Sequence, residues 1–491
     1  MREKKSIRIV DWAFTGLWVA LLFSGIGFKV SAKLAGWPDF DSFTLRENRE
    51  LARFPDLRNL PPEKWGAGVE AWYNDNFAWR ARLIQFYRHV HFAWLKTAVA
   101  QEVPGRKGWV FRCGGNWAEL EDYLGAFELG EEELRRWMVL FEGRTAWAEA
   151  HGVVWLYAIT PVKAQIHPEM VFPMIAAHRG PCVRAQVRER LAGSPAENHV
   201  LFLSDVIAAA TREKPVFYKD DHHVNGYGTW LIYDAVVRRL REFLPDLPDV
   251  PPLVGTPPPE AVERAEEPGC FLKEERLCVR MPGMHETKSP LFGLFRLGGR
   301  RPVVSVAVEQ DGARRTVVMG NDSFMRFSLA GWHFEKDRLC LPFGAGFDRM
   351  VSLLFMRFST ERLEQVVEAE SPVCIIEQFP EVKLTAETVG YDETMERAAA
   401  WLHGTAAEGE GRVQVLATLR GVTAEGDGPV RVVLRDAAGN ALAEETVPPG
   451  RIRAVFFGEA GIPAGGASLD VLGGRAESAE LQFRSAWRRE G

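Results

Sequence analysis

The stretch TVVMGNDSF at residues 316–324 places a short apolar strand directly before a polar turn, and the helical pattern Met325–Phe334 follows it. Runs of strand length that are almost entirely apolar occur four more times, at Val153–Thr160, Val200–Leu203, Met350–Phe355 and Val373–Phe379. Strands buried on both faces have this composition, as in a mostly parallel sheet covered by helices. Amphipathic helical patterns lie between the runs, so the sequence predicts an α/β fold with a parallel sheet flanked by helices.

The composition of the chain excludes several classes of protein. The chain has 491 residues, of which 46% are hydrophobic and 26% charged, so it is long enough for two or three domains and is neither disordered nor fibrous. The net charge of −6 argues against nucleic acid as a partner, because phosphate-binding proteins carry a basic excess. The six cysteines contain no C-x-x-C spacing, which argues against a structural zinc site. We expect no metal and no cofactor.

The N-terminus has the pattern of a membrane anchor. The apolar run Ile9–Phe28 has about 20 residues, which at about 1.5 Å each is long enough to cross the hydrocarbon layer. Basic residues before the run predict a single-pass inner-membrane protein with a cytoplasmic N-terminus and its catalytic part in the periplasm. The alternative is a cleaved signal peptide, with Val30-Ser31-Ala32 as the cleavage site. The basic residues are Arg2, Lys4, Lys5 and Arg8.

Changes in composition and in hydrophobic pattern divide the chain into five parts. After the anchor at residues 1–32, an aromatic and charged segment covers 33–100, and the α/β pattern covers 101–390. Residues 391–411 are expected to be a linker, since they end in a stretch rich in Gly and Glu. In residues 412–491, apolar and polar residues alternate over short runs, which predicts a small β-sandwich-like accessory domain.

The first candidate site is the segment KDDHHVNGYG at residues 219–228, in which Asn225 is placed to be the N-cap of a following helix. In an extended chain, side chains at positions i and i+2 point the same way. Asp221 can therefore accept a hydrogen bond from one imidazole nitrogen of His223 and leave the other nitrogen to act as a base. By the same spacing, Asp220 and His222 are expected to point away.

The second candidate site is Ser323, in the turn after the 316–319 strand. A serine at this place lies at the carboxyl edge of the sheet beside the N–H groups of the first helical turn, which could supply a nucleophile and part of an oxyanion hole. Each segment also has a simpler interpretation, because serine is a common N-cap and two Asp with two His could bind a metal. The two segments together favour a Ser-His-Asp catalytic site, since each supplies what the other lacks.

With these residues in place, the sequence resembles the alginate O-acetyltransferase family of the AlgJ/AlgX type, which has an SGNH-hydrolase-like domain. Asp221-x-His223 followed by Asn225 matches the family's Asp-x-His-Trp-Asn element, with Val224 in place of the usual Trp, and Ser323 matches its nucleophile. Here, as in the family, the Asp-x-His pair precedes the serine. Further blocks between Glu47 and Glu381 carry the resemblance: ENRELARFPDL at 47–57, VEAWYNDNFAWRARL at 69–83, GWVF at 108–111, TPVK at 160–163 and HPE at 167–169.

The resemblance implies a polysaccharide O-acetyltransferase. Ser323 would carry the acetyl group as an acetyl-enzyme, with His223 as general base and Asp221 orienting it. A hydroxyl of an exported polysaccharide would be the acceptor, and a membrane-bound O-acyltransferase would be the acetyl donor. The C-terminal β region would correspond to the carbohydrate-binding module of some family members. Residues expected to line the oxyanion hole or to bind substrate are Phe324, Asn321, Lys163 and Asn225.

Two other functions fit the same sequence. A polysaccharide acetylesterase or deacetylase would use the same triad and would differ only in its acceptor, which is water. A non-catalytic carbohydrate-binding scaffold of an export complex is the second alternative. The presence of Ser323, His223 and Asp221 argues against the scaffold, because such a protein has no need of a triad.

Overall fold

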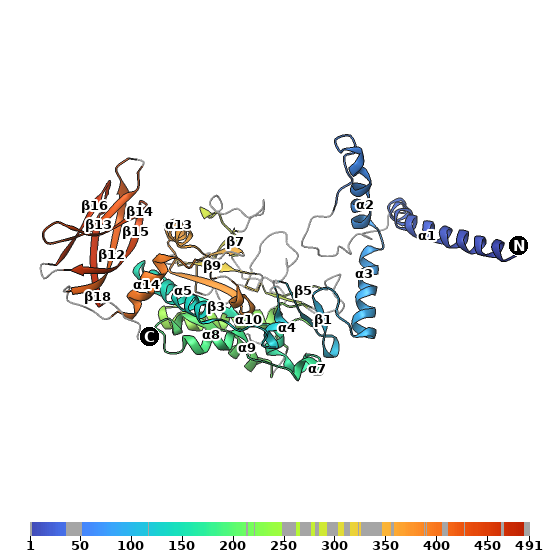
Figure 1. The fold of residues 1–491 in the computed structure, drawn as a ribbon, viewed down its shortest axis with the longest axis horizontal. Coiled ribbons are helices and arrows are strands. Elements are labelled where there is room, and N and C mark those ends of the chain that lie inside the picture. The colour runs from blue at the N-terminus through green and yellow to red at the C-terminus, as the bar shows by residue number, and fades with distance from the viewer. Residues whose placement is uncertain are drawn as a thin grey trace. The chain divides into compact units, whose positions relative to one another are not determined.

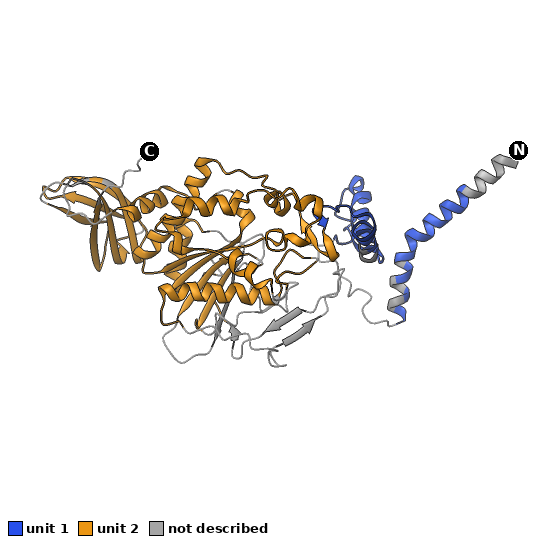
Figure 2. Ribbon diagram, turned by 90° about the horizontal axis from the view of Figure 1, so that it is seen from below, with its two compact units in different colours: residues 1–104, 266–275 blue, residues 105–265, 276–491 orange. Residues whose placement is uncertain are grey.

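Figure 1 shows the order of the elements from α1 at the N-terminus to β18 near the C-terminus. Figure 2 shows two compact units, unit 1 with residues 1–104 and 266–275, and unit 2 with residues 105–265 and 276–491. The computed structural model describes residues 2–35, 52–115, 117–212, 215–219, 221–247, 262–265, 276–279, 284–291, 303–308, 315–322, 324–325, 346–354, 358–386, 388, 390–404, 411–426, 428–462 and 466–485.

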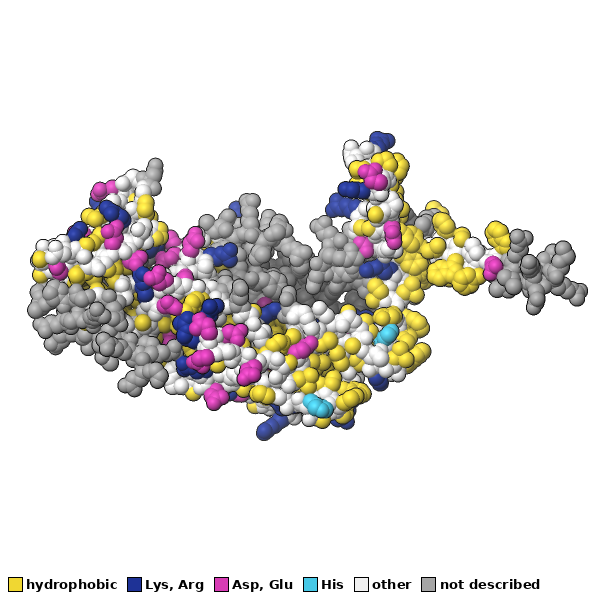
Figure 3. Space-filling view, viewed as in Figure 1, with side chains coloured by type: hydrophobic (Ala, Val, Ile, Leu, Met, Phe, Trp, Pro, Cys, Tyr) yellow, Lys and Arg dark blue, Asp and Glu magenta, His cyan; other side chains and the backbone are white. Residues whose placement is uncertain are grey.

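Unit 1 is mainly helical. Within it, α1 contacts the segment around the end of α2, because the Tyr73 hydroxyl donates to Leu22 O and the rings of Phe28 and Trp79 lie 4.8 Å apart. Hydrophobic side chains follow α1 in Figure 3. Among the described residues, no helix has both the length and the apolar composition that a membrane span requires. The elements of unit 1 are α1 (Arg2–Leu34), η2 (Pro62–Lys64), α2 (Trp65–Asn76), α3 (Arg80–His89), the π-helical turn η3 (Val90–Leu95) and β1 (Glu102–Pro104).

Unit 2 is built on a seven-stranded sheet with the order β4-β3-β11-β9-β10-β8-β7. The first five strands are parallel and correspond to the five apolar runs of the sequence, so the predicted parallel α/β sheet is confirmed. Two antiparallel strands that the sequence did not indicate, β8 (Val303–Val308) and β7 (Met284–Glu286), extend the sheet beyond β10. The parallel strands are β4 (Val200–Phe202), β3 (Val154–Thr160), β11 (Cys374–Pro380), β9 (Thr316–Asn321) and β10 (Arg349–Leu354).

Helices connect the parallel strands, as expected of an α/β fold. The longer ones are α5 (Glu131–Ala150), α8 (Val183–Leu191), α9 (Ser204–Ala210), α10 (Gly226–Phe243), α13 (Thr360–Glu370) and α14 (Glu393–His403). The shorter elements are η4 (Arg106–Gly108), β2 (Val110–Arg112), α4 (Glu119–Tyr123), α6 (Lys163–Ile166), η5 (Pro168–Met170), α7 (Pro173–Ala176), η6 (Glu197–His199) and η8 (Glu381–Thr385). A separate antiparallel pair consists of β5 (Val262–Ala265) and β6 (Arg276–Val279).

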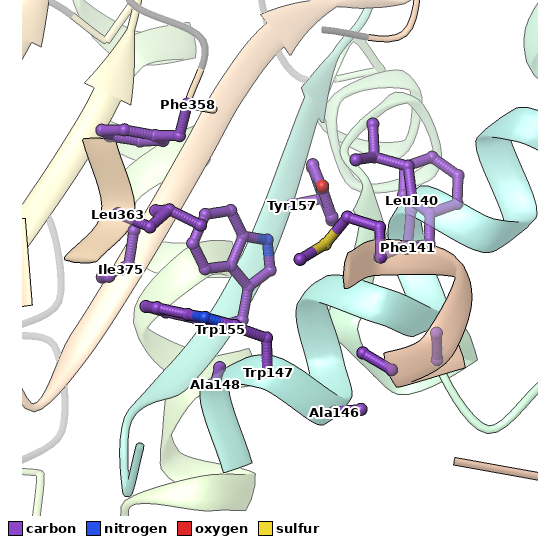
Figure 4. Packing of buried hydrophobic residues seen from close by; sticks show 14 of the residues in the cluster. Leu140, Phe141, Ala146, Trp147, Ala148, Trp155, Tyr157, Phe358, Leu363 and Ile375 are labelled. Carbon is purple, nitrogen blue, oxygen red and sulfur yellow. The ribbon is translucent and has the colours of Figure 1, made fainter. Parts of the chain in front are cut away.

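The main core contains one face of the sheet together with α5, α13 and α14 (Figure 4). Alternate residues of β3 point to this face, where the Tyr157 ring lies 4.8 Å from that of Phe141 on α5. Trp155, two residues before Tyr157, is completely buried in the same cluster, as are Leu363 of α13 and Ile375 of β11. Large apolar side chains thus hold the helices on the sheet. Polar groups near the ends of the strands can therefore form a functional site.

The C-terminal part of unit 2 consists of two antiparallel sheets around a separate small core. One sheet contains β12, β15, β17 and β18, and the other contains β13, β14 and β16. Apolar residues alternate along these strands and point into the space between the sheets, as in a β-sandwich. The strands are β12 (Gly411–Ala424), β13 (Val430–Asp436), β14 (Ala441–Val447), β15 (Gly450–Ile462), β16 (Ala467–Leu472), β17 (Gly474–Arg475) and β18 (Ser478–Ser485).

The expected linker at residues 391–411 contains a helix. α14 occupies Glu393–His403, and its apolar face, which includes Met395 and Trp401, is buried in the main core. Phe456 of β15 belongs to the same core, and Arg397 of α14 forms an ion pair with Glu445 of β14. The two C-terminal sheets are therefore packed directly on α14, which is the opposite of a flexible connection.

The central position of β11 leads to a stability prediction. Replacement Ile375→Ala should lower the free energy of unfolding by about 2–5 kcal/mol, because the completely buried side chain leaves a cavity between strands held on both sides. Urea denaturation followed by circular dichroism measures the change. The control is Met174→Ala on α7, whose exposed side chain should contribute less than about 0.5 kcal/mol. Equal effects of the two substitutions would contradict this description of the core.

Candidate active site

Hydrogen bonds between neighbouring strands fix the turn that follows β9. The Asp322 N–H donates to Gln378 Oε1 of β11 at 3.0 Å, and Gln378 Nε2 donates to Thr160 Oγ1 of β3 at 3.1 Å. On the other side, Ser352 Oγ of β10 donates to Asn321 Oδ1 at 2.6 Å. Side chains of three neighbouring strands therefore hold the residues just before Ser323 at the carboxyl edge of the sheet. Ser323 itself lies outside the described residues.

Asp221 and His223 lie on a short turn formed by two chain segments that pair with each other. Phe217 and Val224 form an antiparallel bridge, and the Tyr218 N–H donates to His223 O at 3.2 Å. Asp221 Oδ1 accepts from the backbone N–H of His223 at 3.0 Å and lies 2.6 Å from its Nδ1. The contact expected from the i, i+2 spacing is therefore present.

The contacts of Asp221 within the turn favour its ionised form. Burial would raise the pKa of its carboxyl group, but the imidazole of His223, its hydrogen bonds and His222 hold the pKa well below its ordinary value. Because a carboxylate can only accept, Nδ1 of His223 is the donor in the 2.6 Å bond. The proton-accepting nitrogen of this tautomer is Nε2, which is the arrangement that a general base requires.

Lys163, at the start of α6, binds the backbone of this turn. Its Nζ donates to the carbonyl oxygens of Tyr218 at 3.2 Å, Lys219 at 3.1 Å and Asp221 at 2.7 Å. The residue is only 1% exposed, and Nζ also lies 5.3 Å from the ring centre of Phe111. The buried ammonium group thus replaces the water it has lost with three carbonyl oxygens and an aromatic face, and it holds the segment that carries Asp221 and His223.

Two buried carboxylates hold the segment that carries Lys163. Glu381 accepts from the Val162 N–H at 3.1 Å and forms an ion pair with Arg184 at 3.0 Å. Glu119 accepts from the Ala164 N–H at 2.5 Å. Burial raises the pKa of Glu381 to about 7, although Arg184 opposes the shift. The backbone on both sides of Lys163 is therefore bonded to acidic side chains that are completely buried.

Four rings meet beside the Asp221–His223 pair. The centre of the Phe324 ring lies 5.2 Å from that of His223 and 5.6 Å from that of Trp117, on which it is stacked. His222 lies between Trp117 and His223, at 4.7 Å and 4.0 Å. Since Phe324 directly follows Ser323, the two candidate segments of the sequence, about 100 residues apart, are brought together here.

The expectation that His222 points away is wrong. Its Nδ1 lies 3.3 Å from Asp221 Oδ1, because the chain turns tightly at this point and does not run as an extended strand. Burial, together with the nearby His223, holds the pKa of His222 well below its ordinary value. Ligand atoms of Asp221, His222 and His223 lie within 4.8 Å of one another, so this group of three could hold a metal ion. Asp220 lies outside the described residues.

The residues expected to bind the oxyanion or the substrate all make contacts within the protein, and their roles in binding stay predictions. Lys163 is buried against carbonyl oxygens, as described. Asn225 is the N-cap of α10, accepting from the Gly228 N–H at 2.9 Å. Asn321 is 1% exposed and its Nδ2 donates to Asp322 O. The Phe324 N–H donates to Asp322 Oδ1 at 2.8 Å.

Several residues of the site had no recognised signal in the sequence. Thr160 and Gln378 could have been found, because both end predicted strands whose carboxyl ends must share one edge of the sheet. Nothing in the sequence singled out Trp117 or Glu381, whose roles depend on contacts between distant segments.

Comparison with solved structures finds distant similarities, at low sequence identity and low TM-score. No protein-family model matches the chain, and no curated protein matches its sequence. Its structure is similar to the O-acetyltransferase domain of Pseudomonas putida AlgJ, at 14% identity and a TM-score of 0.35, over 61% of this chain and 99% of that chain. It is also similar to Bacillus cereus PatB1 with a sulfonyl adduct, at 11% identity and a TM-score of 0.39, over 58% of this chain and 98% of that chain.

A further similar structure is Pseudomonas aeruginosa AlgX, at 12% identity and a TM-score of 0.33, over 78% of this chain and 93% of that chain. AlgJ and AlgX are the proteins of the type that the sequence motifs resemble. At these identities and TM-scores the likeness assigns neither an activity nor a role to an individual residue.

The contacts of Lys163 predict a local effect on the turn. Replacement Lys163→Met keeps most of the side-chain volume but leaves three carbonyl oxygens without a donor, so the free energy of unfolding should fall by about 3 kcal/mol. Amide hydrogen exchange over residues 218–223 should become faster. The control is Lys288→Met, a change at an exposed lysine of the same unit. Unchanged exchange over 218–223 would show that Lys163 does not hold this turn.

The raised pKa of Glu381 predicts a pH dependence. The folded protein holds the proton of Glu381 up to about pH 7, whereas the ordinary pKa of a glutamate is 4.5, so this group makes the protein less stable as the pH rises between these values. From pH 5 to pH 8, the wild type should lose about 2–3 kcal/mol of unfolding free energy relative to Glu381→Gln. Urea denaturation at both pH values measures this difference. A constant difference would mean that Glu381 titrates normally.

Proposed function

We propose that the chain is a polysaccharide O-acetyltransferase that uses Ser323, His223 and Asp221 as a catalytic triad. The observation that carries the proposal is the Asp221–His223 pair, whose Oδ1 and Nδ1 atoms are 2.6 Å apart, with the His223 ring beside Phe324. The pair is therefore next to the residue that follows the proposed nucleophile. The reaction class follows from the resemblance of the sequence motifs to the alginate O-acetyltransferase family.

The proposed reaction has two steps. In the first, His223 Nε2 takes the proton of Ser323 Oγ while Oγ attacks the carbonyl carbon of the acetyl donor, and the donor's leaving group departs with that proton. In the second, a sugar hydroxyl gives its proton to His223 and attacks the acetyl-enzyme, and Ser323 Oγ leaves and recovers the proton. Asp221 holds the ring orientation and stabilises the imidazolium that forms in each step.

The oxyanion of each step requires hydrogen-bond donors. The Phe324 N–H is bonded to Asp322 Oδ1, so we propose the Ser323 N–H as the first backbone donor. The oxygen of an acyl group on Ser323 would be close to the N–H of the next residue, Phe324. It could therefore compete with Asp322 Oδ1 for that N–H.

Transfer to a sugar must outcompete hydrolysis at the acetyl-enzyme, which requires that the acceptor is bound and oriented. The half-buried ring of Trp117, which is stacked on the buried ring of Phe324, is the surface that we propose for the sugar, since aromatic faces suit the apolar face of a pyranose. The acetyl donor of this proposal is a membrane-bound O-acyltransferase, because a periplasmic enzyme has no direct supply of cytoplasmic acetyl-CoA. Anchoring by residues 1–32 would keep the enzyme near that donor.

The triad is tested by substitution and mass spectrometry. Ser323→Ala and His223→Ala should lower turnover of a soluble acetyl ester by about 1,000-fold or more, because each removes a group that acts in both steps. Ser323→Ala should also prevent acetylation of the peptide that contains residue 323. Asp221→Asn should lower turnover strongly, while the matched change at its neighbour, Asp220→Asn, should leave it near the wild-type value. An acetyl group on another residue of the Ser323→Ala protein would overturn the assignment.

The acceptor is tested with the wild-type protein. Incubation with the acetyl ester and acidic or neutral oligosaccharides should give acetylated glycan by mass spectrometry, and Ser323→Ala should give none. Release of acetate alone with every acceptor would favour the esterase over the transferase.

A further inference from the structure

Unit 1 carries an exposed hydrophobic surface on α3 and η3. Its large side chains are each more than half exposed: Leu83, Phe86, Tyr87, Trp94 and Leu95. The first three are spaced i, i+3 and i+4, so they lie on one face of α3, and the last two are exposed at the end of η3, the element that directly follows α3. Contiguous exposed side chains of this size mark an interaction site in soluble domains.

The segment that carries this surface has an excess of positive charge. Residues 76–101 contain no Asp or Glu, but they contain four fixed cations, whereas the whole chain has a net charge of −6. Arg88 is one of the four, and it pairs with Glu102, just beyond the segment. The excess of positive charge therefore lies on the helix that exposes the aromatic rings. The four cations are Arg80, Arg82, Arg88 and Lys96.

This combination fits a lipid surface better than a protein groove. Helices that lie in the interface of a bilayer have aromatic residues and Leu on one side and Arg or Lys around them. Their cations are attracted to anionic headgroups. The 16 residues Arg80–Leu95 extend about 24 Å, which is too short to span a bilayer. A second helix of the same unit, α1, also exposes large apolar side chains, including Trp12 and Trp18.

We propose that α3 and η3 bind flat on the surface of a bilayer that contains anionic phospholipids. Phe86, Tyr87 and Trp94 would enter the interface between headgroups and acyl chains, with the basic side chains at the level of the phosphates. The proposal is independent of the triad, and it does not require that α1 spans a membrane. It gives unit 1 a function of its own, which is to hold the chain on a membrane surface.

Hydrogen–deuterium exchange of the full chain tests this surface even if α1 also binds lipid, because exchange is measured peptide by peptide. The probes are vesicles of phosphatidylglycerol with phosphatidylethanolamine and vesicles of phosphatidylcholine alone. With the anionic vesicles, exchange over residues 83–95 should slow by at least about tenfold, and with phosphatidylcholine it should change little. Unchanged exchange with both vesicles, equal slowing with both, or slowing only when a partner protein is added would overturn the proposal.

Two variants separate the contribution of the apolar side chains to lipid binding from that of the basic residues. Phe86→Ser combined with Trp94→Ser should remove the slowing by anionic vesicles, and the control Met174→Ser, at an exposed methionine of unit 2, should retain it. If the serine variant no longer forms the helix without vesicles, Arg80→Gln combined with Lys96→Gln provides the second test, since it keeps the apolar side chains. Full slowing in the glutamine variant would contradict the role of the basic residues.

Discussion

The buried ammonium group of Lys163 is the interaction on which the candidate site depends. A charge that is 1% exposed is costly unless its protons are bonded, and the Lys163 ammonium donates to the carbonyl oxygens of Tyr218, Lys219 and Asp221. Because those carbonyls belong to the turn that carries Asp221 and His223, the need to satisfy one charge also fixes the position of the proposed base. Glu381 and Glu119 bind the backbone on either side of Lys163. The buried acidic side chains therefore position the lysine, the lysine positions the turn, and the turn positions the imidazole of His223.

The parallel sheet supplies the other half of the site. In a parallel sheet, the carboxyl ends of all strands meet at one edge, so polar side chains that end β3, β11 and β10 can reach the turn after β9. Thr160, Gln378 and Ser352 do this through hydrogen bonds with each other or with residues 321 and 322. Core side chains are direct neighbours of these polar residues, since Ile159 precedes Thr160, Leu353 follows Ser352 and Phe379 follows Gln378. Because alternate residues of a strand point to opposite faces, one strand can supply both the core and the site.

The sequence predicted the parts of this structure that depend on local pattern. Five apolar runs became the five parallel strands, because buried strands must be apolar throughout. The expected contact between Asp221 and His223 is present, although the chain makes it in a tight turn and not in the extended segment that the i, i+2 argument assumed. The expectations that differ from the structure concern residues whose positions depend on tertiary contacts. No local pattern shows that the ammonium group of Lys163 donates to carbonyl oxygens of a distant turn, and its expected role in substrate binding stays a prediction. His222 was expected to point away, yet a tight turn brings it to Asp221. The linker was expected from composition, whereas the apolar face of α14 packs into the core.

The most direct measurement of the central claim is covalent labelling with a sulfonyl fluoride, which reacts with an activated serine, followed by peptide mapping. The account predicts a single rapidly formed adduct on Ser323, and it predicts that Asp221→Asn and Lys163→Met slow its formation without changing the labelled residue, because both substitutions act through His223. Rapid labelling of a different residue, or a rate on Ser323 that neither substitution changes, would contradict the account.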